Sequence, residues 1–381
     1  MSTAPWPRPA LMPPRLYPFE RTFLRLLHLE PLPPDLPTDW DAVHRLARRE
    51  QVIPLLWDGI RRAGVTVPGP VARELASASE RAAQRAVRVE MELAAVLSAL
   101  NREGVRPLLL KGAALARATY PDPALRPMHD LDLLVAPETV NAAHRALCAL
   151  GYRIAGGAPS AADRTWRSAR GYMPPSGLTL PVDLHWRYAG YPHLLPLDHD
   201  AVACRARPVD VAGAQALLPA PADLIVGLAV FWMRELWYGR PRARYIRDIA
   251  EVAARGGVDW TFAGAVCVEA RRTVQVAVAL AADLFGAPVP AEALAVLEGG
   301  RWPYLARRLT ARLQARLLRE EAALSAIVQV GLLRWLGGEA PADFLRWVGR
   351  LVWIPQPLAA GRRRWLRRLW GAVTSGTPRP P

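Results

Sequence analysis

Two aspartates lie inside a short apolar run, HDLDLLV, and they restrict the folds open to this chain more than any other feature. The run is typical of a buried strand, in which residues two apart point to the same face. Asp130 and Asp132 would then share one apolar face, where their charges repel each other and are costly to desolvate. A divalent cation removes both problems, and carboxylate ligands favour Mg²⁺ or Mn²⁺. The alternative is a strand end whose aspartates lie in solvent or cap the next helix.

Strand and helix patterns alternate around this run. Residues 105–110, VRPLLL, form an apolar run bounded by turn residues, and AALARATY after it is typical of a short helix. PETVNAAHRALCALGY predicts a second helix that begins at a proline and ends at Gly151. Two more strands are expected around TWRSARGYM and LTLPVDLHWRY, and the latter places Asp183 between apolar neighbours. This order predicts a small α+β core with a mixed sheet.

Helical patterns flank the core on both sides. An apolar stripe at steps of three and four residues leads to Leu100, and Gly104 stops this helix. From Pro221 onward the pattern is helical again, and a short basic helix follows near the end. The sequence predicts a proline-rich tail at residues 1–17, an N-terminal helical region at 18–103 and the α+β core at 104–200. A second helical region is predicted at 201–300, and a basic C-terminal helical region with a tail at 301–381.

The net charge and the cysteines indicate which partners and which cellular compartment suit the protein. The net charge of +15 suits polyanionic partners such as nucleic acid, acidic membranes or nucleotides, although compositional bias toward arginine accounts for the same figure. Three widely separated cysteines without a Cys-x-x-Cys motif indicate a reducing compartment and no structural zinc. The apolar runs are too short to span a bilayer, and the N-terminus lacks a signal-peptide core. We therefore expect a cytoplasmic protein without a transmembrane segment.

Lys111 is the only lysine among 49 basic residues, and it precedes a glycine at a predicted helix start. Backbone N–H groups and the helix dipole favour an anion there, and Gly112 permits close approach. Lysine adds a compact charge that can follow a moving phosphate, whereas arginine brings a rigid planar fork. A phosphate-binding role is therefore favoured over chance survival of one lysine. A covalent role is discounted, because the Lys-x-Asp-Gly motif of lysine-adenylating ligases is absent.

The segment LLLKGAALARATYPDPALRPMHDLDLLV, with a helix, LGY and VDLHW after it, resembles the uncharacterised nucleotidyltransferase family of the polymerase-β-like superfamily. The likeness extends over residues 20 to 290 and is strongest from 106 to 135. It implies transfer of a nucleoside monophosphate from an NTP, with ATP expected, to a hydroxyl or similar group, with release of pyrophosphate. It also implies Mg²⁺ or Mn²⁺ as cofactor. The acceptor is expected to be a small molecule, peptide or protein, since no nucleic-acid-binding module is evident.

The resemblance assigns roles to the acidic residues. Asp130 and Asp132 would hold the metal that bridges the triphosphate. Asp183 would complete a second metal site and favour the deprotonated form of the attacking hydroxyl. His185 follows Asp183 by two residues and faces the same side, where it would orient a metal ligand or the acceptor.

The resemblance also assigns phosphate contacts. Lys111, Gly112 and Ala113 would bind phosphate at the helix start. The superfamily usually has Gly or Ser where this chain has Ala113, which offers only its backbone N–H. Arg126 matches a recurrent arginine of the family and would clamp the triphosphate with two parallel hydrogen bonds, the alternative being a surface role.

Two other classes of function stay open. Ala113, in place of a hydroxyl residue, favours a catalytically weak or inactive nucleotide sensor or scaffold on the same fold. A basic adaptor is the other class, in which residues 362–373 would bind nucleic acid or lie on an anionic membrane surface. For this last helix, the favoured alternative is simple docking of its aromatic face onto the rest of the protein.

Overall fold

The computed structural model describes residues 17–28, 39–154, 168–188, 199–237, 242–265 and 268–293. The proline-rich tail predicted for residues 1–17 and the basic region predicted for residues 301–381 therefore lie outside the described residues, apart from Tyr17. In the described part of the chain, no helix is both long enough and apolar enough to cross a membrane.

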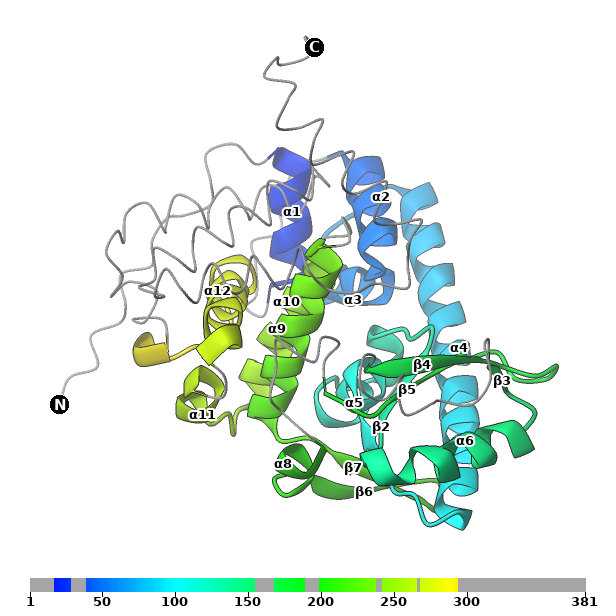
Figure 1. Ribbon diagram of the computed structural model, residues 1–381. Helices are drawn as coiled ribbons and strands as arrows, with labels where there is room; N and C mark the ends of the chain where they lie inside the picture. The colour runs from blue at the N-terminus through cyan, green and yellow to red at the C-terminus, as the bar shows by residue number, and fades with distance from the viewer. Residues whose placement is uncertain are drawn as a thin grey trace, which may run out of the picture.

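A mixed sheet organises the middle of the chain (Figure 1). Its seven described strands lie in the order β3-β4-β5-β2-β1-β7-β6. The pairs β2–β5 and β1–β7 are parallel, and the other neighbours are antiparallel. In chain order the strands are β1 Leu108–Leu109, β2 Leu131–Leu134, β3 Arg153–Ile154, β4 Ala169–Met173, β5 Val182–His185, β6 Arg207–Val211 and β7 Ala214–Leu218. The predicted α+β class with a mixed sheet is confirmed.

Helices surround this sheet and extend on one side into a separate helical layer (Figure 1). The α-helices are α1 Pro18–Leu26, α2 Trp40–Glu50, α3 Ile53–Ala63, α4 Gly69–Arg102, α5 Lys111–Ala118, α6 Val140–Ala149, α8 His199–Ala203, α9 Pro221–Trp237, α10 Ala243–Arg255, α11 Trp260–Ala265 and α12 Val268–Phe285. Two single 3₁₀ turns, η1 Pro123–Leu125 and η2 Pro137–Thr139, lie next to strand β2 in the sequence, one on each side of it.

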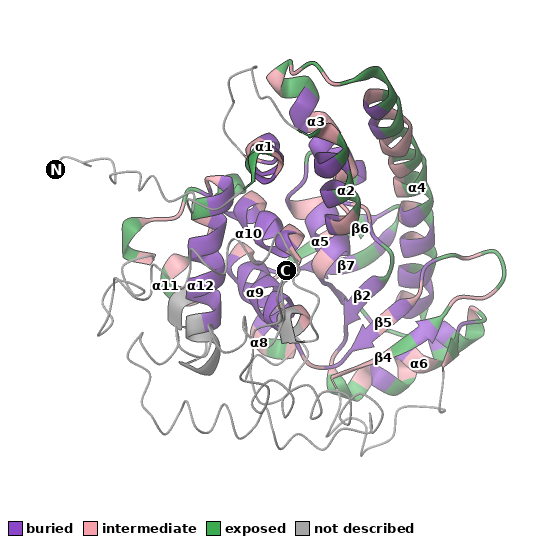
Figure 2. Ribbon diagram, turned by 90° about the horizontal axis from the view of Figure 1, so that it is seen from above, coloured by how far each residue is buried: buried purple, intermediate pink, exposed green. Residues whose placement is uncertain are grey.

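The long helix α4 follows the apolar stripe seen in the sequence. Leu93, Val96 and Leu100 are fully buried, whereas the opposite side of the helix faces solvent (Figure 2). The helix ends where predicted, because Gly104 adopts a left-handed conformation with φ +75° and donates its N–H to the carbonyl of Asn101 at 2.9 Å.

The two faces of the sheet are covered by different helices. On one face, the Tyr172 hydroxyl of β4 lies 3.0 Å from the ring of His144 in α6, and α6 packs on α4. On the other face, the ring of His185 in β5 meets Phe231 of α9 edge-on, with the ring centroids 6.3 Å apart. Since residues alternate along a strand, Asp132 in β2 also points toward α9, as its contact with His185 confirms.

The sheet continues beyond residue 200, which corrects the expectation of a helical region from 201 to 300. The hairpin β6–β7 was not predicted from the sequence. Its two-residue turn consists of Ala212 and Gly213, both at positive φ, +49° and +88°. This conformation is usual for a tight hairpin, but Asn-Gly or Asp-Gly is its common signature, and Ala-Gly gives no such signal.

Ala212 provides a test of this hairpin. Alanine at positive φ is strained, so Ala212→Gly should raise the free energy of unfolding by about 0.5–1 kcal/mol. The same change in a helix, at the exposed Ala83 of α4, should lower it by about 1 kcal/mol. Chemical denaturation measures both effects, and equal destabilisation by the two variants would contradict the turn.

Candidate functional site

The register of β2 and β5 brings two of the predicted acids together. These strands are parallel neighbours, and Asp132 pairs directly with Asp183. His185, two residues further along β5, lies with its Nε2 atom 3.0 Å from Oδ1 of Asp132. Asp132, Asp183 and His185 can each offer one ligand atom such that all three atoms lie within 4.8 Å of one another. Two carboxylates and an imidazole at this spacing are able to hold a divalent cation.

Lys111 lies against the same carboxylate. Its ammonium group forms an ion pair with Oδ1 of Asp132 and lies 4.3 Å from the ring centroid of Phe231. The backbone fixes this arrangement, since Leu110 donates its N–H to the carbonyl of Asp132 at 3.0 Å. Lys111 itself begins α5 with φ +43°. The single lysine therefore neutralises a buried carboxylate, and its contact with phosphate stays a prediction.

The charge state of Asp132 follows from these contacts. Burial acts to raise its pKa, but the ammonium of Lys111 and the hydrogen bond to His185 outweigh burial. The net result is a pKa well below the usual range of a carboxyl group. Asp132 is consequently ionised at neutral pH and presents a full negative charge to a cation.

Asp130 differs from Asp132 in position and environment. The strand begins at Leu131, so Asp130 lies in the preceding bend and is exposed, whereas the sequence placed both aspartates inside the strand. Its pKa is nevertheless raised, mainly by desolvation and then by the negative charge of Asp132. Asp130 is therefore near the acidic group but outside the trio that can share one ion, and His185 takes the third place.

A glycine that the sequence analysis did not single out keeps Asp183 accessible. Gly171 of β4 is the antiparallel partner of Asp183. A β-carbon at Gly171 would lie 3.2 Å from Oδ1 of Asp183, closer than ordinary packing. The absence of a side chain leaves that flank of the carboxylate open. No spacing rule marks this glycine, because its role depends on pairing between two strands.

Gly112 serves packing in this structure. A β-carbon there would lie 2.5 Å from the Cγ atom of Met128, so the close approach that we expected from phosphate is made by a side chain of the protein. Ala113 is fully buried. A contact between phosphate and the backbone N–H groups of Gly112 and Ala113 stays a prediction.

Arg126 requires a correction. Its guanidinium is buried and bonds both oxygens of Asp248 in α10, with Nε–Oδ1 at 2.7 Å and Nη2–Oδ2 at 2.8 Å. Tyr120 donates its hydroxyl to the same carboxylate at 2.9 Å. The fork that was expected to clamp a triphosphate is thus occupied by a carboxylate. The partner lies far along the chain, so spacing within the motif could not reveal it.

Other basic groups surround the bend that carries Asp130. The pKa of His129 is lowered by burial first and then by the charges of Arg85, Arg244 and Arg126. The positive charge of Arg244 also acts on Asp130. Helices α4 and α10 thereby bring Arg85 and Arg244 to this edge. Neither was predicted from the sequence, because no motif marks either one among so many arginines.

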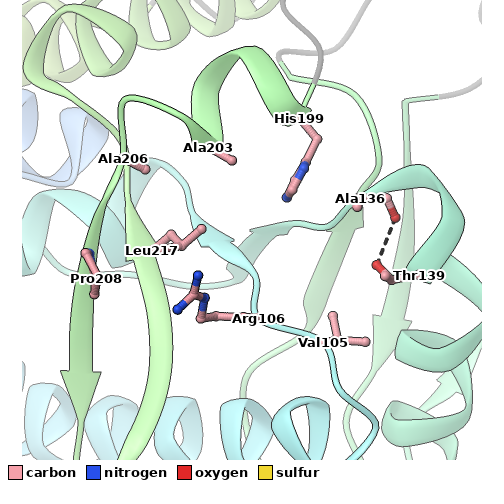
Figure 3. A pocket seen from close by; sticks show the side chains of 9 residues that line it. All are labelled: Val105, Arg106, Ala136, Thr139, His199, Ala203, Ala206, Pro208 and Leu217. Atoms are coloured by element: carbon pink, nitrogen blue, oxygen red, sulfur yellow. Dashed lines mark hydrogen bonds between the residues drawn. The ribbon is translucent and has the colours of Figure 1, made fainter.

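A cavity of about 350 Å³ lies apart from the acids. Figure 3 shows Arg106 and His199 among the side chains that line it. Arg106 precedes β1 and Lys111 follows it, so this cavity lies toward the opposite end of β1 from Lys111. It therefore contributes nothing to the group of Asp132, Asp183 and His185.

The chain matches a known protein family over most of its described residues. A family described as "Uncharacterised nucleotidyltransferase" matches residues 37–286, which is more than half of the chain. No curated protein and no solved structure gives a significant match. The matched range includes every strand of the sheet and all the acidic residues described above.

Lys111→Met tests the ion pair with Asp132. Removing one partner of a buried pair leaves an uncompensated charge, so the free energy of unfolding should fall by about 3 kcal/mol in a metal-free buffer. Mn²⁺ should restore much of this loss by binding the folded state.

The double variant Lys111→Met/Asp132→Asn is the matched control. It should lose less stability than Lys111→Met alone and should not respond to Mn²⁺, because neither charge remains. Denaturation with and without Mn²⁺ measures both effects. If Lys111→Met is as stable as the unmodified protein, the ion pair is not formed.

Arg126→Met separates a structural role from a phosphate clamp. Loss of the buried pair with Asp248 should lower the free energy of unfolding by about 3–5 kcal/mol. Arg61→Met, at an exposed position of α3, should change it by less than about 0.5 kcal/mol. Weakened nucleotide binding with unchanged stability would instead support the clamp.

Proposed function

The chain belongs to the uncharacterised nucleotidyltransferase family, and on this basis we propose that it transfers a nucleoside monophosphate from an NTP to an acceptor and releases pyrophosphate. The observation that carries this proposal is the pairing of Asp132 with Asp183 on adjacent strands, with His185 beside them. We propose ATP as the nucleotide and a hydroxyl or similar group of a small molecule, peptide or protein as the acceptor. The cytoplasmic location expected from the sequence belongs to the same proposal.

The donor set of the site fits a divalent metal ion. Asp132 and Asp183 supply the hard oxygen ligands that Mg²⁺ and Mn²⁺ prefer, and the imidazole of His185 adds one nitrogen ligand beside them. We propose that these three residues would hold the ion, with Asp130 at its edge. When bound, the cation supplies positive charge that offsets the phosphates and polarises the phosphoryl oxygens.

The basic residues would act on the triphosphate. Lys111 neutralises Asp132 when no cation is present. We propose that the ammonium of Lys111 would turn from Asp132 toward a phosphate oxygen when a nucleotide binds. Arg244 lies near Asp130 and would add a second positive charge at the same edge. Arg126 is left out of this role because Asp248 holds its guanidinium.

The transfer itself requires an in-line displacement. The acceptor oxygen forms a bond to the α-phosphorus while the bond from that phosphorus to the bridging oxygen breaks, and pyrophosphate leaves with the electron pair. Asp183 is half-buried, and Gly171 leaves its flank open. We propose that its carboxylate receives the proton of the acceptor hydroxyl and passes it to solvent.

A nucleotide sensor on the same fold is the second candidate. Ala113 offers no hydroxyl to the phosphates, and the ammonium of Lys111 is bound to Asp132 in this conformation. Nucleotide binding without pyrophosphate release over a wide range of acceptors would favour the sensor. The adaptor alternative depends on residues 362–373, which lie outside the described residues.

Pyrophosphate release tests the proposed function. The protein, incubated with NTPs, Mg²⁺ or Mn²⁺ and a pool of candidate acceptors, should release pyrophosphate, and ATP should be the preferred nucleotide. Asp132→Asn and Asp183→Asn should each lower the rate by about 100-fold or more, because each removes a charged ligand.

Asp58→Asn serves as the control for these variants. Asp58 pairs with Arg62 on the exposed side of α3, so its loss should leave the rate unchanged. Far-UV circular dichroism establishes that each variant is folded. Rates equal to the unmodified protein for both Asp132→Asn and Asp183→Asn would overturn the assignment.

A further inference from the structure

A second cavity, of about 640 Å³, lies between α4, α5 and the loop that leads into β2. Apolar side chains form much of its wall, among them Ala86 and Leu93 of α4 and Ala116 of α5. Its volume lies within the range of cavities that bind small molecules, which are mostly apolar with a few polar groups.

The cavity adjoins the proposed catalytic edge through the loop before β2. Met128 lines the cavity and also covers Gly112, which follows Lys111. Asp130 is only two residues beyond Met128, and two residues span at most about 7 Å. A molecule in the cavity that extends past Met128 would therefore bring a functional group to the bend that carries Asp130.

Three arginines line the cavity, and two of them form ion pairs with acidic side chains. Arg117 pairs with Glu90, and Arg126 pairs with Asp248. Arg85 also lines the cavity, and no acidic side chain among the described residues pairs with it. Its charge helps to lower the pKa of His129, the neighbour of Asp130. An anionic group would be stabilised there.

The rim of the cavity on α4 is unusually apolar for an exposed helix face. Val87 and Met91 both line it, and these residues are 65% and 69% exposed to solvent. Exposed large apolar side chains beside a cavity commonly mark a binding surface. A ligand with an apolar body would cover these two side chains.

We propose that this cavity binds the acceptor, and that the acceptor is a small amphipathic anion with an apolar body and a carboxylate or phosphate group. The apolar body would lie between α4 and α5, the anionic group would contact Arg85, and the reactive hydroxyl would extend past Met128 toward Asp130. The inference rests on the proposed function for the identity of the ligand as acceptor. The chemistry of the cavity itself is independent of it.

Anilinonaphthalene sulfonate is a suitable probe, because it joins an apolar aromatic body to an anionic group. It should bind the full-length protein with a rise in fluorescence. Arg85→Gln should weaken this binding about tenfold, since a charge-assisted contact is lost. Arg88→Gln, on the same helix but outside the cavity wall, should change it less than twofold.

A second pair of variants fills the cavity. Ala83 is exposed and lines the cavity, so Ala83→Trp should block probe binding without disturbing the fold. Gln84→Trp adds the same ring at a neighbouring position outside the lining and should bind the probe normally. Equal behaviour of Ala83→Trp and Gln84→Trp, or of Arg85→Gln and Arg88→Gln, would overturn the site.

Competition decides whether the ligand is the acceptor. In the pyrophosphate assay, the probe should compete with the acceptor pool and not with ATP. Displacement of the probe by Mg²⁺–ATP alone would show that the nucleotide occupies the cavity, which overturns the acceptor assignment. Probe binding that depends on Arg85 but is accompanied by no pyrophosphate release from any NTP would contradict the proposed function and leave the anion site standing.

Discussion

The ion pair between Lys111 and Asp132 is the interaction on which the candidate site depends. A fully buried carboxylate at the centre of a sheet needs a counter-charge, and this chain supplies it from the residue that begins α5. The pair ties the end of β1 to the middle of β2 through side chains, while the N–H of Leu110 does so through the backbone. The arrangement keeps Asp132 ionised and aims it at the space beside Asp183.

Much of this arrangement could be predicted from the sequence, because the patterns involved are local. The alternation of strand and helix around HDLDLLV indicated the α+β core, and Asp183 was recognised from its apolar neighbours. The lone lysine was also recognised as unusual. Its contact with Asp132 was not predicted, because a lysine before a glycine at a helix start suggested a phosphate ligand. In the structure its partner is the carboxylate of Asp132 on the adjacent strand.

The features that the sequence did not reveal depend on pairings between distant segments. Gly171 gains its meaning only from its position opposite Asp183, and Arg126 only from Asp248 in a helix of another region. The hairpin β6–β7 was missed for a local reason, because its Ala-Gly turn lacks the usual asparagine or aspartate. His185 was placed on the correct face, and the strand register then brought it to Asp132.

The parallel register of β2 and β5 has a consequence for how this fold can vary. Backbone hydrogen bonds between the two strands set the distance from Asp132 to Asp183, independently of the chain that connects them. That connection passes through α6, β3 and β4, so insertions or deletions along it alter the surroundings of the acids without moving them apart. Related chains could therefore differ in the surface around Asp132 and Asp183 while the spacing of these two aspartates is kept.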